Sequence, residues 1–462
     1  MTTPDTTAGT RDVVPFRDAI RVWFTISLQT FGGPAGQIAV MQRHLVDDRR
    51  WISQHRFLHA LNYCMLLPGP EAQQLAIYVG WLLNGLRGGL VAGTLFVLPG
   101  VVALLALSAI YVGFGDTTVV TGLFAGLAPA VVAIVAQAVW RVGGRALTNR
   151  VLLGVAVAAF GALALFGVPF PIVIAVAAAL GWALHRWRPA LIDNRGGHGP
   201  ERSGPPPLIS DDALHHDRPS ARRAVVVLAV GLPLWLLPVA AFALITGPDS
   251  VYTQQGLFFS GTAVVTFGGA YAVLAFVAQR AVEHYGWLSA GDMVRGLALA
   301  ETTPGPLIMV VQFVAFLGAY HRPGALDPWT AGVVASLLTT WVTFVPCFLF
   351  ILLGAPYVEK LRGNRAVSAA LTGITAAVVG VIANLGLYFA VHTLFGAVRP
   401  VTAGPLALQL PDPATVRPGA AVLTLLAALL LIKVKWSVLR VLAVCAVAGL
   451  LAALAGVPGL GL

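Results

Sequence analysis

The same succession of motifs occurs twice in this chain, at one fixed spacing. Thr30-Phe31-Gly32-Gly33 returns as Thr266-Phe267-Gly268-Gly269, and Pro68-Gly69-Pro70 returns as Pro304-Gly305-Pro306. Trp51 and Trp287 are separated by the same 236 residues (267 − 31, 287 − 51 and 304 − 68), so the register holds without a gap from one motif to the next. A long-period repeat in a very apolar chain is typical of a duplicated membrane transporter.

Beyond the second motif the spacing grows to 247 residues (346 − 99 and 373 − 126), as Pro99 with Pro346 and Gly126 with Gly373 show. The eleven additional residues (247 − 236) fit the polar insert around 321–324. The sequence therefore predicts three parts. These are a first repeat at 1–187, a linker at 188–222, and a second repeat at 223–462 that begins with one extra helix at 223–246.

The composition predicts an all-α integral membrane protein. Hydrophobic residues make up 58% of the chain and charged residues only 10%, with a mean hydropathy of +0.83, whereas a soluble domain carries about 25% charged residues. A backbone in hydrocarbon must satisfy its own N–H and C=O groups, so apolar runs of about 20 residues are expected to be helices. The runs are 89–112, 118–140, 150–167, 170–187, 223–246, 330–355, 366–392 and 436–456, with a shorter one at 419–432.

The remaining composition excludes several classes of function. The net charge of +10 lies in loops that flank the apolar runs, which indicates contact with membrane lipid rather than with nucleic acid. Cys64, Cys347 and Cys445 are isolated and have no paired or metal-binding spacing. The chain has no phosphate-binding GxxxxGK loop, so neither ATP coupling nor a cofactor is expected.

Loop charge predicts the orientation, because basic loops stay on the cytoplasmic side. The arginine-rich linker 188–222 and the N-terminus are placed in the cytoplasm, and so are the arginines that follow segments 20–42 and 57–85. Each of these segments is too short for two full spans, so each is predicted to be a re-entrant hairpin or a broken helix. The extra helix at 223–246 then inverts the topology of the second repeat. Trp51 and Trp287 are expected to anchor at the membrane interface.

The repeated motifs are the predicted breaks, and they predict an anion site. A helix that begins in mid-membrane leaves its first N–H groups free and presents the positive end of its dipole. Proline suits the first helical position, and glycine permits close approach. Four such N-termini around a pseudo-twofold axis suit an oxyanion such as chromate or sulfate. The predicted substrate-binding residues are Phe31, Gly32, Gly33, Pro34, Gln37, Pro68, Gly69, Pro70, Gln73, Gln74, Phe267, Gly268, Gly269, Pro304, Gly305 and Pro306.

Two acids in the motif segments are candidates for proton coupling. Glu71 follows Pro70, where the second repeat has Leu307, and Glu301 precedes Pro304, where the first repeat has Met65. A carboxyl group inside a membrane segment is costly and often carries protons. The alternatives are a favourable charge at a helix N-terminus for Glu71 and solvation at the interface for Glu301.

The segments FGGPAGQIAVMQ (31–42), LPGPEAQQLAIYVG (67–80) and LPG (98–100), with FGG and TPGP in the second half, resemble the chromate ion transporter (CHR) family in its long-chain, two-domain type. The resemblance covers about residues 15–187 and 223–456. It implies export of chromate across the bacterial inner membrane, chromate resistance, and two halves of opposite orientation. The second half departs from the pattern, since FGGAYAV lacks the proline and PGPLIMV lacks the Glu and Gln residues.

The predicted function is that of a secondary active transporter that exports chromate by alternating access between the repeats. A transporter of sulfate or another oxyanion and an anion channel are the alternatives. An enzyme is not expected, because reduction of chromate would need a flavin or nicotinamide fold or clustered Cys and His residues, which the sequence lacks. The expected partners are the oxyanion, membrane lipid and a second copy of the chain in a homodimer.

Overall fold

A computed structural model describes residues 12–189, 208, 220–267, 269–354, 365–404, 406–457 and 459. Gly268 and most of the linker 188–222 lie outside these residues. The described part of the first half is helical: α1 (Phe16–Ser27), α2 (Gly33–Gln42), the π-helical turn η1 (Arg43–Asp48), α3 (Gln54–Cys64), α4 (Glu71–Phe114), α5 (Thr118–Ala146), α6 (Arg150–Ala164) and α7 (Phe170–Trp187).

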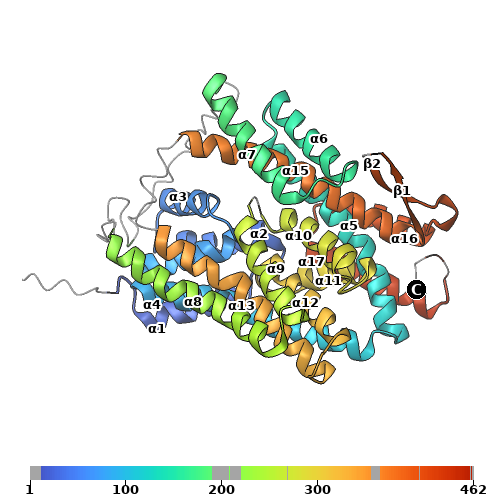
Figure 1. The fold of residues 1–462 in the computed structure, drawn as a ribbon, viewed down its shortest axis with the longest axis horizontal. Coiled ribbons are helices and arrows are strands. Elements are labelled where there is room, and N and C mark those ends of the chain that lie inside the picture. Colours follow the sequence, from blue (N-terminus) through green and yellow to red (C-terminus); the bar gives the residue numbers. More distant parts are fainter. Residues whose placement is uncertain are drawn as a thin grey trace, which may run out of the picture.

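The helix α8 (Ala221–Thr246) leads into the second half (Figure 1). The elements that follow are α9 (Val251–Val265), α10 (Ala270–Gln279), η3 (Arg280–His284), α11 (Ala290–Thr302), η4 (Leu307–Met309), α12 (Val310–His321), α13 (Pro328–Gly354), α15 (Arg365–Leu394), β1 (Val398–Ala403), β2 (Leu406–Pro411), η6 (Pro413–Thr415), α16 (Pro418–Ile432) and α17 (Val438–Leu454). One short β-hairpin thus interrupts the expected all-α pattern, with β1 antiparallel to β2 and Val398 opposite Pro411.

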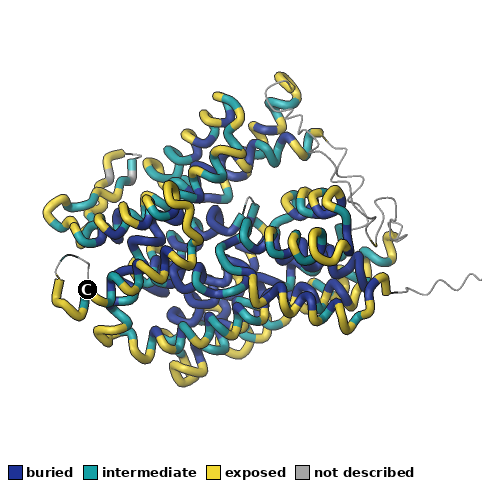
Figure 2. The backbone as a smooth tube through the Cα atoms, turned by 180° about the vertical axis from the view of Figure 1, so that it is seen from behind, coloured by how far each residue is buried: buried dark blue, intermediate teal, exposed yellow. Residues whose placement is uncertain are grey.

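Buried residues gather in the middle of the molecule (Figure 2), and α10, α11 and α12 of the second half contribute many of them. Trp51 is buried in the core of the first half and Trp287 in the core of the second, with 7% and 1% of their surfaces exposed. The expectation that they anchor at the membrane interface is therefore wrong. Each packs inside the protein, Trp287 by stacking on Tyr285 at a ring distance of 4.3 Å.

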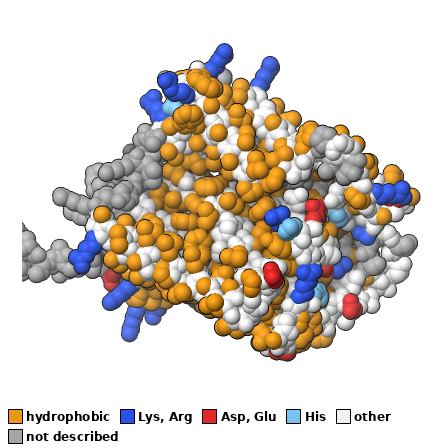
Figure 3. Space-filling view, in the orientation of Figure 1, with side chains coloured by type: hydrophobic (Ala, Val, Ile, Leu, Met, Phe, Trp, Pro, Cys, Tyr) orange, Lys and Arg blue, Asp and Glu red, His pale blue; other side chains and the backbone are white. Residues whose placement is uncertain are grey.

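Six of the described helices are long and apolar enough to cross a bilayer: α4, α5, α7, α8, α13 and α15. Figure 3 shows the broad hydrophobic surface over α8 and α13. The chain is a multi-pass membrane protein, as its composition predicts. The predicted runs 150–167 and 436–456 do form helices, but α6 and α17 have only 15 and 17 residues.

Helices on either side of each repeated motif fold back on one another. Tyr63 of α3 and Tyr78 of α4 have ring centroids 5.6 Å apart, and Phe258 of α9 and Phe276 of α10 have centroids 5.4 Å apart. The two residues of each pair are almost equally distant along the chain from the motif between them. Because a helix rises about 1.5 Å per residue, such pairs meet only when the two arms lie side by side. The motifs are therefore the tips of helical hairpins.

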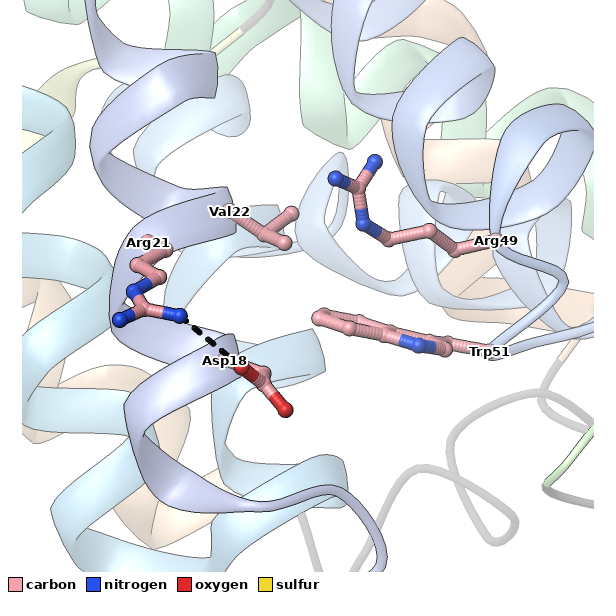
Figure 4. A pocket seen from close by; sticks show the side chains of 5 residues that line it. All are labelled: Asp18, Arg21, Val22, Arg49 and Trp51. Carbon is pink, nitrogen blue, oxygen red and sulfur yellow. Dashed lines mark ion pairs between the residues drawn. The ribbon is translucent and has the colours of Figure 1, made fainter.

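The arms α11 and α12 form a hairpin of the same kind at Pro304-Gly305-Pro306. Between α11 and α12, Phe313 packs against Gly296. At the Thr30-Phe31-Gly32-Gly33 motif the chain turns between α1 and α2, and Gly32 and Gly33 have positive φ angles of +78° and +70°. A surface pocket of about 320 Å³ lies near the start of α1. It lies between Asp18, Arg21 and Val22 near the start of α1 and Arg49 and Trp51 just beyond α2 (Figure 4).

After the second hairpin of each half, the chain reverses into a long apolar helix. Within α4 the reversal occurs at Asn84 and Gly85, whose backbone angles are not helical. The segments 71–83 and 86–114 then lie back to back, so a Cβ atom on Gly80 would lie 2.5 Å from the carbonyl oxygen of Gly88. In the second half a polar loop at 322–327 makes this reversal between α12 and α13, at the place predicted for the eleven-residue insert.

The last helices of each half pack on the other half. Gly126 of α5 touches the backbone of α17 at Cys445, and Gly373 of α15 touches the backbone of α7 at Ala177. Gly126 and Gly373 are equivalent positions in the repeat (373 − 126 = 247). Small residues at such crossings let membrane helices approach closely. In Figure 1, α6 and α7 accordingly lie along α15.

Candidate functional site

The hairpin tips of the two halves are joined by a pair of reciprocal hydrogen bonds. The backbone N–H of Gly305 donates to the carbonyl oxygen of Thr30 at 3.0 Å, and the backbone N–H of Gly69 donates to the carbonyl oxygen of Thr266 at 2.8 Å. Thr30 and Thr266 are equivalent in the repeat, as are Gly69 and Gly305 (266 − 30 = 305 − 69 = 236). The same contact is thus made twice, each time between the halves.

The glycine of each Pro-Gly-Pro tip is required by its backbone conformation. Gly69 has φ +119° and Gly305 has φ +100°, a region that other residues adopt only with strain. Each glycine also approaches the long helix of the opposite half. A Cβ on Gly305 would lie 3.5 Å from Gly100 of α4, and one on Gly69 would lie 2.9 Å from Cys347 of α13.

A small cavity lies where the four tips meet. Its volume is about 10 Å³, about the room of a single water molecule. The lining residues are Pro34, Gln37, Pro70, Glu71, Ala72, Gly269, Ala270, Pro306 and Leu307. They come from the first turns of four helical arms, namely α2, α4, α10 and the arm formed by η4 and α12. The site is closed and must widen to admit an ion of several atoms.

The N-termini at the cavity have no side-chain caps, whereas three of the four neighbouring arms, α3, α9 and α11, are capped at their outer ends and α1 is not. Ser53, Ser250 and Ser289 accept hydrogen bonds from the first turns of α3, α9 and α11. By contrast, no side chain caps α2, α4, α10 or η4. Four N-termini without a side-chain cap, those of α2, α4, α10 and η4, therefore face one small volume. The positive ends of helix dipoles favour an anion there.

The structure brings some of the predicted substrate residues to the cavity and leaves others outside it. Pro34, Gln37, Pro70, Gly269 and Pro306 line it. The predicted residues that do not line it are Phe31, Gly32, Gly33, Pro68, Gly69, Gln73, Gln74, Phe267, Pro304 and Gly305; Gly268 lies outside the described residues. Ala72, Ala270 and Leu307 line the cavity without having been predicted, because short apolar side chains give no chemical signal.

In this closed form, two of the predicted amide donors form hydrogen bonds to backbone carbonyl groups of the Pro-Gly-Pro motifs. Gln37 Nε2 donates to the carbonyl oxygen of Gly305 at 2.5 Å, and Gln74 Nε2 donates to that of Pro68 at 2.6 Å. Gln73 is fully buried, and neither atom of its amide group has a hydrogen-bond partner. An unpaired buried amide is costly, so Gln73 is a donor that a rearranged site has available.

The two candidate acids occupy different positions relative to the cavity. Glu71 is the first residue of α4 and lines the cavity, with Oε1 4.0 Å from where a Cβ on Gly269 would lie. Glu301 is 2% exposed and does not line it. The hydroxyl of Tyr271 donates to Glu301 Oε1 at 2.5 Å, and Glu301 Oε2 has no partner. Sequence reasoning missed Tyr271, which follows the tip by two residues.

Comparison with known proteins shows the family to which the chain belongs. A family model described as "Chromate transporter" matches the chain twice, over residues 17–182 and 253–450. The chain belongs to the chromate transporter family. Its two matched ranges and its length identify it as a long-chain member, and the family is one of transporters, not of enzymes.

Relatives of this family align over most of the chain. The "Chromate transport protein" of Pseudomonas aeruginosa is 34% identical and covers 77% of this chain and 76% of its own. The "Chromate transport protein" of Cupriavidus metallidurans is 29% identical, covering 85% and 88%. The "Probable chromate transport protein" of Synechococcus elongatus is 27% identical, covering 83% and 88%. No solved structure matches the chain.

Proposed function

We propose that this protein is a secondary active transporter that exports chromate across the bacterial inner membrane. The observation that supports it is the closed cavity between the halves, onto which four uncapped helix N-termini open. Each N-terminus carries roughly half a positive charge, about two in total, which complements a divalent oxyanion. The lining contains no Lys or Arg, so a bound anion faces no full opposite charge that would retain it.

We infer an inverted topology from the hairpins. If each hairpin re-enters on one side, residues 86–114 and helices α5, α6 and α7 make four crossings. The N-terminus and the linker 188–222 then lie together in the cytoplasm. The single crossing of α8 inverts the second half, so that the domains are the repeats 1–187 and 223–462. The reciprocal bonds between Thr30, Gly69, Thr266 and Gly305 are what such a pseudo-twofold axis produces.

Cysteine accessibility tests this topology. In a background without Cys64, Cys347 and Cys445, single cysteines at His55 and Arg87 are expected to react with an impermeant thiol reagent from the cytoplasmic side. A cysteine at Asp116, between α4 and α5, is expected to react from outside. All three positions are exposed. Labelling of His55→Cys and Arg87→Cys from opposite sides would contradict the re-entrant hairpin.

The position of Glu71 suggests how the anion is coupled to protons. Its carboxyl group occupies the region that an oxyanion needs, and two negative charges there repel each other. Binding of the anion therefore favours protonation of Glu71, and release of the anion favours loss of that proton. We propose Glu71 as a proton-coupling group, with Glu301 as a second one behind the cavity wall.

Flux of radiolabelled chromate in proteoliposomes tests the function. Saturable flux that responds to an imposed pH gradient is expected for the native chain. In Glu71→Gln this response should be lost, because the side chain no longer exchanges a proton. Glu283→Gln is the matched control, since Glu283 lies in η3 and its carboxyl group bonds Gln409 far from the cavity.

The alternatives predict different results in the same experiment. Sulfate transport without chromate transport would replace the proposed substrate by another oxyanion. Flux that rises linearly with chromate concentration, without saturation, would identify a channel. If the flux in Glu71→Gln still responds to the pH gradient as it does in the native protein, the protein is a chromate transporter in which Glu71 does not couple protons to the anion.

A further inference from the structure

The pair formed by Tyr271 and Glu301 lies between the cavity and the interior of the second half. Tyr271 is the second residue of α10, next to Ala270, which lines the cavity. Its hydroxyl lies 3.8 Å from where a Cβ on Gly33 would be, beside the N-terminus of α2. The same hydroxyl donates to Glu301 Oε1 at 2.5 Å. One hydroxyl therefore lies close both to a buried carboxyl group and to the first turn of a helix that faces the cavity.

This pair exists in one half only. In the first repeat the equivalents of Tyr271 and Glu301 are Ala35 and Met65 (271 − 236 and 301 − 236). Neither equivalent can donate a hydrogen bond or carry a proton. Packing of the duplicated tips therefore does not require the pair, since the first half forms its tip without it.

We propose that Tyr271 is a switch that links the charge of Glu301 to occupancy of the anion site. The inference rests on the function proposed above. When the cavity is empty, the hydroxyl donates to the carboxylate of Glu301. When an oxyanion enters, the hydroxyl turns and donates to one of the anion's oxygens, and Glu301 binds one proton on its free Oε2.

The physical reason is the cost of a buried charge. Glu301 is 2% exposed, and Tyr271 donates to it. A buried carboxylate that loses its donor is destabilised unless it becomes neutral. Transfer of the hydroxyl to the anion therefore favours uptake of a proton by Glu301. Return of the hydroxyl, after the anion has left, favours release of that proton.

The charged residues around Glu301 are compatible with both its ionised and its protonated form. Among the described residues, Arg141 of α5 interacts electrostatically with Glu301 and with Tyr271. On α11 itself, Asp292 and Arg295 pair with each other at 3.8 Å and with Tyr111. They lie nine and six residues before Glu301 (301 − 292 and 301 − 295), about two and a half and about one and a half turns away. Across the cavity the nearest acid is Glu71. The hydroxyl of Tyr271 and the charge of Arg141 favour the ionised form of Glu301, and burial favours the neutral form.

Proton uptake on anion binding tests the switch. Chromate is added to the purified protein in weakly buffered nanodiscs, and bound chromate and absorbed protons are both measured. Glu301→Gln and Tyr271→Phe are each expected to lose the same one proton per anion and to keep chromate binding. Tyr271→Phe should also bind chromate about tenfold more weakly, the loss of one hydrogen bond to a charged group (about 1.5 kcal/mol). The double variant should lose no more protons than either single one.

A second readout does not depend on the anion. Infrared difference spectra of the empty protein should show a protonated carboxyl band in Tyr271→Phe that is absent from the native chain and from the double variant. Tyr252→Phe and Glu283→Gln are the matched controls, because their hydrogen bonds, to Pro323 and Gln409, lie far from the cavity.

The outcomes separate the switch from the transport function. Native proton counts in both variants, with chromate still bound, would overturn the switch and leave the transporter. A proton lost in Glu301→Gln but not in Tyr271→Phe would make Glu301 a proton site without a switch, and so overturn the role of Tyr271. Failure of the native protein to bind any oxyanion would refute the proposed function, and the proton-uptake step with it.

Discussion

Replacement of Gly126 by leucine is expected to prevent α5 from packing on α17. A Cβ atom at this position already overlaps the carbonyl oxygen of Cys445 and lies within 3.0 Å of the backbone nitrogen of Gly449. Backbone atoms cannot move aside as a flexible side chain does, so the two helices must separate. We expect a loss of about 3 kcal/mol or more in the free energy of unfolding, the upper range for overpacking. The measurement is the melting temperature and the monodisperse fraction in detergent.

The duplicated architecture supplies the controls for this experiment. Gly373→Leu should have a comparable effect, because Gly373 makes the equivalent contact with α7. Gly154→Leu, on α6, should behave as the native protein does, since nothing lies within 4 Å of a Cβ there. A native melting temperature for Gly126→Leu would show that the halves do not exchange their last helices in this way.

Replacement of Gly305 by alanine is expected to abolish most chromate flux in a protein that still folds. The positive φ of +100° costs an alanine about 1–2 kcal/mol. That strain falls on the tip whose N–H donates to Thr30 and whose carbonyl oxygen accepts from Gln37. A displaced tip misplaces the helix N-terminus that begins at Pro306. We expect at least a tenfold lower flux, because misplacement of a binding group by about 1 Å has effects of that size or larger.

Strain alone must be distinguished from damage to the site. Gly324→Ala is the matched variant, because Gly324 has φ +65° in the loop between α12 and α13 and nothing within 4 Å of a Cβ. It should lose similar stability and keep its flux. Equal loss of flux in both variants would mean that the Gly305 tip has no special part in transport. Gly69→Ala, at the equivalent tip, should resemble Gly305→Ala.

The repeat allowed much of the fold and part of the site to be predicted. Glycine and proline at equivalent positions predicted helix breaks, and the structure has hairpin tips at each of them. From the breaks followed the convergence of four N-termini, which the cavity between Pro34, Pro70, Gly269 and Pro306 displays. These inferences needed only local rules of helix termination together with the duplication.

Other features depend on contacts between distant parts of the chain and were not predictable. Tyr271 and Glu301 are thirty residues apart (301 − 271), and nothing in either position signals a pair until the hairpins bring them together. Trp51 and Trp287 were misplaced, because tryptophan at the end of a membrane segment usually lies at the interface. Here both rings are buried against other residues of the protein. The packing of the last helices of each half on the other half likewise depends on tertiary contacts, such as that of Gly126 with Cys445, which the sequence does not show.

Glu71 comes from the first half and Glu301 from the second. Protonation of these two acids has an electrical consequence. A divalent oxyanion that crosses alone moves two negative charges, whereas one accompanied by a single proton moves one. With both acids protonated, the loaded protein moves no net charge at all. A membrane potential of 100 mV, negative inside, is worth about 2.3 kcal/mol for each charge moved. The number of protons held by these two side chains therefore decides how strongly the cell's voltage expels the anion. A cycle that loads both acids is electroneutral, and its direction depends on the concentration gradients of the anion and of protons.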